Sequence, residues 1–375
     1  MKIKFFYSNR FMIIIFGAGI AGLFTGYNLL KRGKEIKIID TNSIKAGSTD
    51  ASVGMLAPFI EAKPGEDELL NLMLNSKKIW EEFQLNKKFS KCIDLKENSS
   101  LMIGLNEDDK EKLKFKKKFF ENFGFKTFLL DAKETLKLEP SLNSNVYCSL
   151  LCNNQNQVNS NFLKIFLIKE IKKMGGEIKY VKKINKIYLK KKKVFFNDSF
   201  LQFEKIIICC GAWSSEIIYN SFGLKLPLRP LKGLSILVKS NENNFLHNLW
   251  FRNIYIAPRS EGILAIGATE EDRGFDESIK MDELYYLTNS MWESFTKLES
   301  LELRDIRVGI RPAVIDGSPI IGNLKEISSD VICNFGHYRH GILLAPISAD
   351  IVSKYVFEEK ISGQFNFFSP SRFKL

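Results

Sequence analysis

Three glycines near the start of the chain, Gly17, Gly19 and Gly22, have the spacing of a dinucleotide-binding turn. In such a turn the missing side chains let backbone amides at a helix N-terminus approach a pyrophosphate. Asp40 follows at the distance where a carboxylate can accept hydrogen bonds from a ribose diol. The chemistry that these residues predict is binding of the ADP half of a dinucleotide, without specifying which dinucleotide.

The residues around the motif predict the elements that must position it. Met12–Phe16 is short, apolar and β-branched, as buried parallel strands are. Leu23–Lys31 has apolar residues at helical spacing, and Ile36–Asp40 indicates a second strand. A glycine turn in an ordinary α/β protein is the alternative, and the complete strand, helix and acid context disfavours it.

Length and composition limit the class of protein. The chain has 375 residues, with 45% hydrophobic and 26% charged residues, which is typical of soluble globular proteins with about two domains. No apolar run is long enough to span a membrane. Residues 1–11 lack a small-residue cleavage site, so we expect an N-terminal extension rather than a signal peptide, and a cytoplasmic location.

The net charge of +12 comes mostly from scattered lysines, with clusters at Lys116–Lys118 and Lys190–Lys193. No aromatic-interleaved basic stripe accompanies them, so a solvated surface is favoured over nucleic-acid binding. The six cysteines show no disulfide or zinc framework, and no metal site is expected.

A second all-apolar strand, Lys205–Cys210, ends at Gly211, so we expect it beside the first strand with its end facing the same crevice. Alternating segments such as Pro227–Val238 and Leu249–Pro258 predict antiparallel strands between the nucleotide-type elements, and a helix over Ile342–Glu358 closes the chain. The pattern predicts an α/β fold with two interleaved domains. The predicted nucleotide-binding domain comprises residues 12–85, 147–220 and 306–375, and the predicted substrate domain comprises 86–146 and 221–305.

Three further segments resemble the D-amino-acid-oxidase family of FAD-dependent oxidoreductases, and within it the glycine oxidases of thiamine biosynthesis. They are Gly54–Pro58, Ile310–Pro312 with Asp316 and Gly317, and Gly336–Pro346, the last being the most specific. The resemblance covers almost the whole chain. It implies a discontinuous, Rossmann-like FAD-binding domain and a mostly antiparallel α+β substrate domain. Gly309 stands where some members carry a flavin-linked cysteine, which implies noncovalent FAD.

The resemblance also implies which residues bind FAD. The pyrophosphate and adenosine ribose would meet Gly17, Gly19, Ile20, Ala21, Gly22, Asp40 and Thr41. The isoalloxazine would meet Ser48, Thr49, Val53, Gly54 and Met55, the adenine side would meet the backbone of Ile184, and Gly211 would face the crevice. The pyrimidine edge of the flavin would meet Gly336, His337, Tyr338, Arg339, His340, Gly341 and Ile342.

For the substrate, the resemblance implies a carboxylate held by Arg311, with Arg339 facing the substrate and Tyr255 closing the pocket. A planar guanidinium can hold a carboxylate bidentately. Hydride transfer from Cα to flavin N5 needs no side-chain base, so neither His337 nor His340 is given a proton role. The predicted reaction is oxidation of glycine or a similar small amino acid, with O2 as acceptor and imine or 2-oxo acid, ammonia and hydrogen peroxide as products.

Several alternatives stay open at this point. A sibling enzyme would be an oxidase or dehydrogenase for D-amino acids or sarcosine. A different class would be an NAD-dependent dehydrogenase built on the same glycine turn, and a third would be a basic, nucleic-acid-associated flavoprotein. The sequence also leaves open whether the chain forms a homo-oligomer. Two departures from the family, Asp50–Val53 and a histidine at position 340 in place of the usual asparagine, loosen the substrate assignment.

Overall fold

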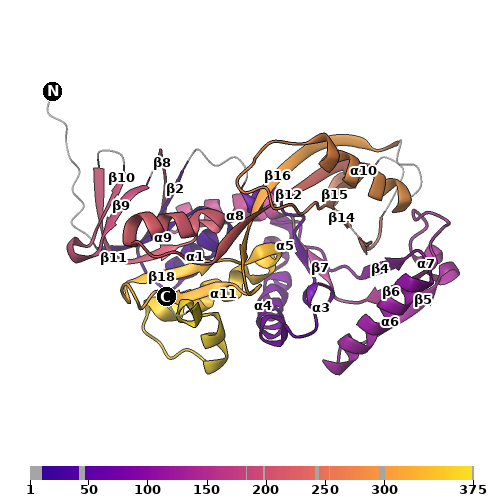
Figure 1. Cartoon of the computed structure of the whole chain (residues 1–375), viewed down its shortest axis with the longest axis horizontal. Coiled ribbons are helices and arrows are strands. Elements are labelled where there is room, and N and C mark those ends of the chain that lie inside the picture. Colours follow the sequence, from indigo (N-terminus) through magenta and orange to yellow (C-terminus); the bar gives the residue numbers. More distant parts are fainter. Residues whose placement is uncertain are drawn as a thin grey trace.

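The computed structural model describes residues 11–41, 47–182, 184–196, 199–240, 245–252, 254–294 and 300–373. Its two large sheets lie in separate lobes, and the chain passes between the lobes more than once (Figure 1). The predicted N-terminal extension, apart from its last residue, lies outside the described residues. The interleaved path agrees with the expected α/β fold.

The first sheet carries the glycine motif. Its main path has the order β17-β18-β11-β1-β2-β8, and the five strands from β18 to β8 run parallel while β17 is antiparallel to β18. The strands are β1 (Met12–Phe16), β2 (Ile36–Thr41), β8 (Glu177–Val181), β11 (Ser199–Ile208), β17 (Ile320–Asn323) and β18 (Val331–Phe335). A hairpin of β9 (Ile184–Tyr188) and β10 (Lys193–Phe196) joins β11. The second apolar strand therefore pairs with β1 as predicted.

Helices cover both faces of this sheet, because alternate residues of β1 point to opposite sides. Ile13 and Ile15 pack in one cluster, whereas Ile14 and Phe16 pack in another with Ile218 of α9. The helices concerned are α1 (Ile20–Lys31), α4 (Asp67–Leu85), α8 (Ser160–Lys173), α9 (Ser214–Phe222) and α11 (Gly341–Val356).

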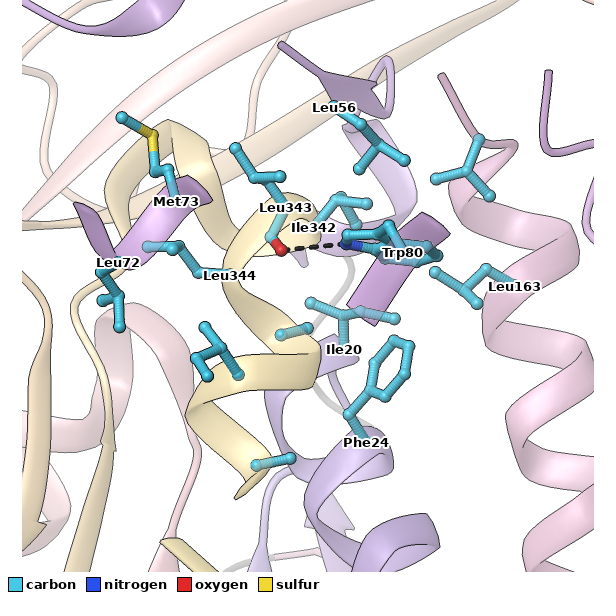
Figure 2. Packing of buried hydrophobic residues seen from close by; sticks show 14 of the residues in the cluster. Ile20, Phe24, Leu56, Leu72, Met73, Trp80, Leu163, Ile342, Leu343 and Leu344 are labelled. Carbon is cyan, nitrogen blue, oxygen red and sulfur yellow. Dashed lines mark hydrogen bonds between the residues drawn. The ribbon is translucent and has the colours of Figure 1, made fainter. Parts of the chain in front are cut away.

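The start of α11 is anchored from α4. The indole Nε1 of Trp80 donates a hydrogen bond to the carbonyl of Leu343 at 2.9 Å, among the buried side chains of α1, α8 and α11 (Figure 2). The hydroxyl of Ser76 donates to the same carbonyl at 2.5 Å. A helix from the end of the chain is thus held beside the glycine turn from its beginning.

The second sheet has the order β16-β12-β15-β14-β13-β4-β6-β5, and every pair except β13 with β4 is antiparallel. Its strands are β4 (Ser100–Gly104), β5 (Thr127–Asp131), β6 (Cys148–Cys152), β12 (Leu228–Lys239), β13 (Asn248–Trp250), β14 (Tyr255–Pro258), β15 (Ile263–Gly267) and β16 (Glu302–Val314). Around it lie α6 (Glu107–Asn122), α7 (Ala132–Leu138) and α10 (Met281–Ser294) (Figure 1).

Small elements connect the lobes. They are α2 (Ser48–Ala51), β3 (Met55–Leu56), α3 (Pro58–Glu61), α5 (Lys87–Cys92) and β7 (Asn156–Gln157).

None of the helices in the described ranges is long and apolar enough to cross a membrane. The same ranges contain no group of three or more acidic, histidine or cysteine side chains suited to a metal ion.

Two details differ from the expectations. Strands β6 and β16 belong to the antiparallel sheet, although the predicted division placed residues 147–220 and 306–375 in the nucleotide-binding domain. Both segments begin with a strand that pairs in the second sheet before the chain returns to the first. The division into domains otherwise stays a prediction. The predicted single strand Leu249–Pro258 is two strands, β13 and β14, which pair with each other.

Candidate cofactor and substrate site

A cavity of about 630 Å³ opens at the carboxyl ends of β1, β2, β11 and β18. This edge of a parallel sheet is where nucleotides bind in open α/β folds. We call this cavity the cofactor cleft. The predicted cofactor residues that line it are Gly17, Gly19, Ile20, Ala21, Asp40, Thr41, Ser48, Thr49, Gly211, His337, Tyr338 and Gly341.

The glycine turn leaves no space for side chains. Gly17 has φ +99°, and a Cβ at this position would lie 2.4 Å from the carbonyl oxygen of Cys209. A Cβ on Gly22 would lie 1.9 Å from the carbonyl oxygen of Gly17. Gly22 is outside the cleft lining, so its contribution is to let α1 start tightly against the turn. The hydroxyl of Thr49 accepts a hydrogen bond from the Ile20 amide at 3.0 Å, which ties α2 to the same helix.

Asp40 is held in place by backbone amides. Its two carboxylate oxygens accept hydrogen bonds from Ala18 N at 2.8 Å and Thr41 N at 2.7 Å. Burial raises the pKa of this carboxyl, while the two amides and the charge of Lys164 oppose that shift. The carboxylate is fixed at the mouth of the cleft, where ribose hydroxyls can donate to it.

Asn334, at the end of β18, is a cleft residue that the sequence analysis missed. Its amide nitrogen donates to the hydroxyl of Thr25 at 3.0 Å. Its buried Oδ1 has no hydrogen-bond partner among the described residues. An unpartnered buried acceptor beside a glycine cradle fits a nucleotide cofactor, which brings hydroxyl and amide donors. Only its place at a strand end could have marked this residue in advance.

A second cavity of about 1060 Å³ lies beneath the antiparallel sheet, and we call it the substrate cavity. It is lined by the predicted residues Val53, Gly54, Met55, Tyr255, Arg311, Arg339 and Ile342. A space of about 60 Å³ connects the two cavities, because it shares lining residues with each. Ser48, Thr49, Tyr338 and Gly341 are shared with the cofactor cleft, and Tyr255, Arg311, Arg339 and Ile342 with the substrate cavity.

Arg311, on β16, is oriented by backbone carbonyls. Its Nη1 donates to the carbonyls of Lys232 at 3.3 Å and Thr269 at 3.0 Å. The guanidinium lies over Gly233, where a Cβ would be 2.2 Å from Nη1. No carboxylate of the described residues forms an ion pair with this arginine. It therefore lines the cavity as a cation whose charge is available to a ligand, and Gly233 and Thr269 are supports that the sequence analysis missed.

Tyr255, on β14, lies beside this arginine. Burial raises the pKa of its hydroxyl, and the charge of Arg311 and a hydrogen bond with it oppose the shift. The phenol stays protonated at neutral pH, as expected for a pocket wall that donates a hydrogen bond.

Arg339 and His340 meet a carboxylate that the sequence analysis did not identify. Glu61 is 9% exposed at the end of α3, with Oε2 3.7 Å from Arg339 Nε and 3.1 Å from His340 Nδ1. Burial lowers the pKa of Arg339, but the charge of Glu61 and neighbouring groups raises it overall. The unusual histidine at position 340 therefore faces an acid. The available sequence signal for Glu61 was that it lies about one helical turn after the Gly54–Pro58 segment.

His337 is buried in the cofactor cleft. Burial, together with the charge of His340, lowers its pKa to about 4, so the imidazole is neutral near pH 7. Its Nε2 has no hydrogen-bond partner in the described ranges. A neutral side chain of this kind can hydrogen-bond a cofactor, and the absence of a proton role stays a prediction.

Besides Gly22, three predicted cofactor residues lie away from these cavities or are only partly described. Gly336 has φ +82°, and a Cβ there would lie 2.5 Å from Val314, so it shapes the turn after β18. His340 contacts Glu61 as described above and does not line the cofactor cleft. Ile184 starts β9, and its side chain is outside the described residues, whereas Tyr180 and Lys182 line the cleft nearby. The individual site assignments stay predictions.

Comparison with known proteins identifies the family. Residues 12–355 match the profile of the DAO family, described as FAD dependent oxidoreductase. The chain belongs to this family. FAD is therefore its cofactor, as predicted, which decides against the NAD alternative, and the cleft described above fits it. A Cβ added at Gly309 would lie 2.8 Å from the Cβ of Ala51, so a larger residue has no space there. Noncovalent attachment of FAD stays a prediction.

Relatives align along nearly the whole chain. The bifunctional protein ThiO/ThiG of Trichormus variabilis is 27% identical over 376 residues, covering 96% of this chain and 55% of the relative, so the chain spans about half of that protein. A glycine oxidase of Bacillus licheniformis is 23% identical over 362 residues, covering 95% of this chain and 96% of the relative. The crystal structure of glycine oxidase from Geobacillus kaustophilus has the same fold, with a TM-score of 0.90, 24% identity and coverage of 97% and 99%.

Proposed function

We propose that this protein oxidises glycine or a similarly small amino acid with FAD, passes the electrons to O2, and serves thiamine biosynthesis. The observation that carries the proposal is Arg311, a cavity cation that forms no ion pair with any carboxylate of the described residues and lies next to the small space shared with the cofactor cleft. An amino acid bound there by its carboxylate would have its Cα near the cofactor.

Bound FAD supplies the acceptor for the hydride that leaves Cα as the carbon–nitrogen double bond forms. The resulting imine hydrolyses to the 2-oxo acid and ammonia, and the proposed acceptor O2 becomes hydrogen peroxide. Arg311 holds the carboxylate, and truncating such a desolvated contact costs roughly 2–5 kcal/mol. Tyr255 donates to the same carboxylate and closes the pocket.

The N-terminus of α11 supplies further positive potential near the cofactor. This helix begins at Gly341, directly after Arg339 and His340, and its first residues line the connecting space and the substrate cavity. A helix N-terminus and an adjacent guanidinium stabilise negative charge. We assign them to the negative charge that the cofactor gains on reduction.

The names of the relatives support the substrate class. The full-length relatives include glycine oxidases, and the thiamine role is suggested by the ThiO/ThiG relative, of which this chain spans about half. Sarcosine and small D-amino acids are the second candidates, because a cavity of about 1060 Å³ exceeds what glycine needs. A cytoplasmic location and self-association stay predictions.

The test is anaerobic mixing of the purified yellow protein with glycine, sarcosine and D-alanine, followed by hydrogen peroxide assays in air. We expect flavin bleaching and peroxide with at least one of the three, glycine first. Bleaching only with the other two would replace glycine by the second candidates. A flavoprotein that none of these amino acids reduces would contradict the proposed function.

A further inference from the structure

The far wall of the substrate cavity carries more charge than glycine binding requires. This wall is formed by α3 and the residues after it, residues 109–116 of α6, and the connection between β13 and β14, whereas Arg311 lies on β16. Its charged lining residues are Glu61, Lys63, Asp109, Lys112, Lys116 and Arg252. Glycine has no side chain that could reach them.

Most cavity cations on this wall and its rim already have an acid. Arg252 holds Asp109 through two hydrogen bonds of 2.7 and 2.8 Å, and Lys112 lies 3.8 Å from the same carboxylate. Arg339 faces Glu61. Within each of these pairs the opposite charges neutralise each other, so little net charge remains for a ligand.

Two cations of this wall, Lys63 and Lys116, form no ion pair among the described residues; Lys63 is exposed, so the partly buried one of the two is Lys116. Its Nζ donates only to the carbonyl of Ile60, at 3.1 Å, and no carboxylate in the described ranges forms an ion pair with it. Burial lowers its pKa, with a further lowering by Arg339 and Lys63 and a partial compensation by Glu61. Like Arg311, it is a partly buried cation of the cavity that lacks an acid.

The neighbours of Lys116 on α6 show that this is not the general state of the lysine-rich helix. Lys114 pairs with Glu111 at 2.5 Å, and Lys117 pairs with Glu121. Both acids are on the same helix at the spacing that favours such pairs. The lysine that faces the cavity is the one left without such a partner among these neighbours.

We propose that Lys116 binds a second acidic group of the substrate, so that the preferred substrate is a small amino acid with two acids. The α-carboxylate is held by Arg311 and the second acid by Lys116, and Arg339 lines the same cavity. This inference rests on the proposed function, since the reaction is unchanged: the Cα–H bond breaks, its electron pair leaves with the hydride for FAD, and the second acid takes no part.

The experiment compares substrates that differ only in the second acid. Anaerobic flavin reduction is measured with D-aspartate against D-asparagine, and with iminodiacetate against its monoamide. We expect the acid to be preferred in kcat/KM by at least about tenfold in one pair, as for a single charge contact in a partly desolvated site. Equal rates for acid and amide in both pairs would overturn the inference.

Three variants assign the preference to Lys116. Lys116→Met should reduce the ratio of acid to amide about tenfold, Lys116→Arg should keep most of it, and Lys118→Met, on the exposed side of the same helix, should leave it unchanged. A non-oxidisable pair, succinate and succinamate, gives a binding readout through the flavin absorption spectrum. A ratio that survives Lys116→Met would overturn the assignment.

The two proposals fail differently. If glycine reduces the flavin and no acid is preferred, only the two-acid inference is wrong. If none of glycine, sarcosine, D-alanine and the members of the two pairs reduces the flavin, the proposed function is wrong and the inference falls with it.

Discussion

The cofactor cleft and the substrate cavity are built in different ways. The cleft is made by backbone: two glycines that exclude side chains, amides that hold Asp40, and strand ends of one parallel sheet. The cavity is made by charged side chains such as Arg311 and Glu61, which come from the second sheet and from the helices and connections around it. We therefore expect backbone geometry to determine cofactor binding and placed charges to determine substrate binding.

The largest expected effect is in the cofactor cleft. Gly22→Val would place side-chain atoms into the Gly17 carbonyl, since even a Cβ would lie 1.9 Å away. We expect loss of FAD, measured as flavin absorbance per mole of purified protein. Gly363→Ala is the control, because a Cβ there meets nothing within 4 Å. A variant that retained full flavin content would show that the tight turn is not required.

The next effect is on stability in the substrate region. Lys232 and Glu283 form a fully buried ion pair at 2.7 Å, and the carbonyl of Lys232 also accepts a hydrogen bond from Arg311. Glu283→Gln leaves the buried ammonium without its acid, which costs about 3–5 kcal/mol. We expect a clear fall in Tm by calorimetry. The double variant Lys232→Met with Glu283→Leu should recover much of the lost Tm. A Glu283→Gln variant as stable as the wild type would refute the stabilising role of this ion pair.

A smaller effect concerns pH and His337, at the boundary of the two regions. Its pKa is lowered to about 4 from 6.5, so the unfolded chain takes up the proton first as the pH falls. The contribution to stability is complete above about pH 6.5 and is lost toward pH 4, with a maximum of about 3 kcal/mol. Tm measured from pH 7.5 to 4.5 should fall more steeply for the wild type than for His337→Asn. Parallel curves would contradict the assignment.

The smallest effect separates substrate binding from cofactor binding. Gly233→Ala would place a Cβ 2.2 Å from Arg311 Nη1 and displace the guanidinium. We expect KM for glycine to rise by about tenfold, equivalent to about 1.4 kcal/mol, with unchanged flavin content. Steady-state peroxide assays measure it. Loss of flavin in this variant would mean that the two regions are not independent.

The same contrast explains what the sequence could predict. The glycine turn, Asp40 and the two apolar strands are local patterns, and the structure brings them to one sheet edge as expected. Arg311 and Tyr255 were identified through the resemblance and do meet in one cavity. Glu61, Lys116 and Asn334 were not identified, because their roles depend on contacts between elements far apart in the chain. The boundaries at β6 and β16 were misplaced for the same reason.

The central claim is that Arg311 anchors the substrate carboxylate while the cofactor cleft works without it. Arg311→Ala tests this most directly, by anaerobic titration of the flavoprotein with glycine. We predict flavin content equal to the wild type and a greatly raised glycine concentration for half-maximal bleaching, corresponding to roughly 2–5 kcal/mol. Bleaching at the same glycine concentrations as the wild type would contradict the account.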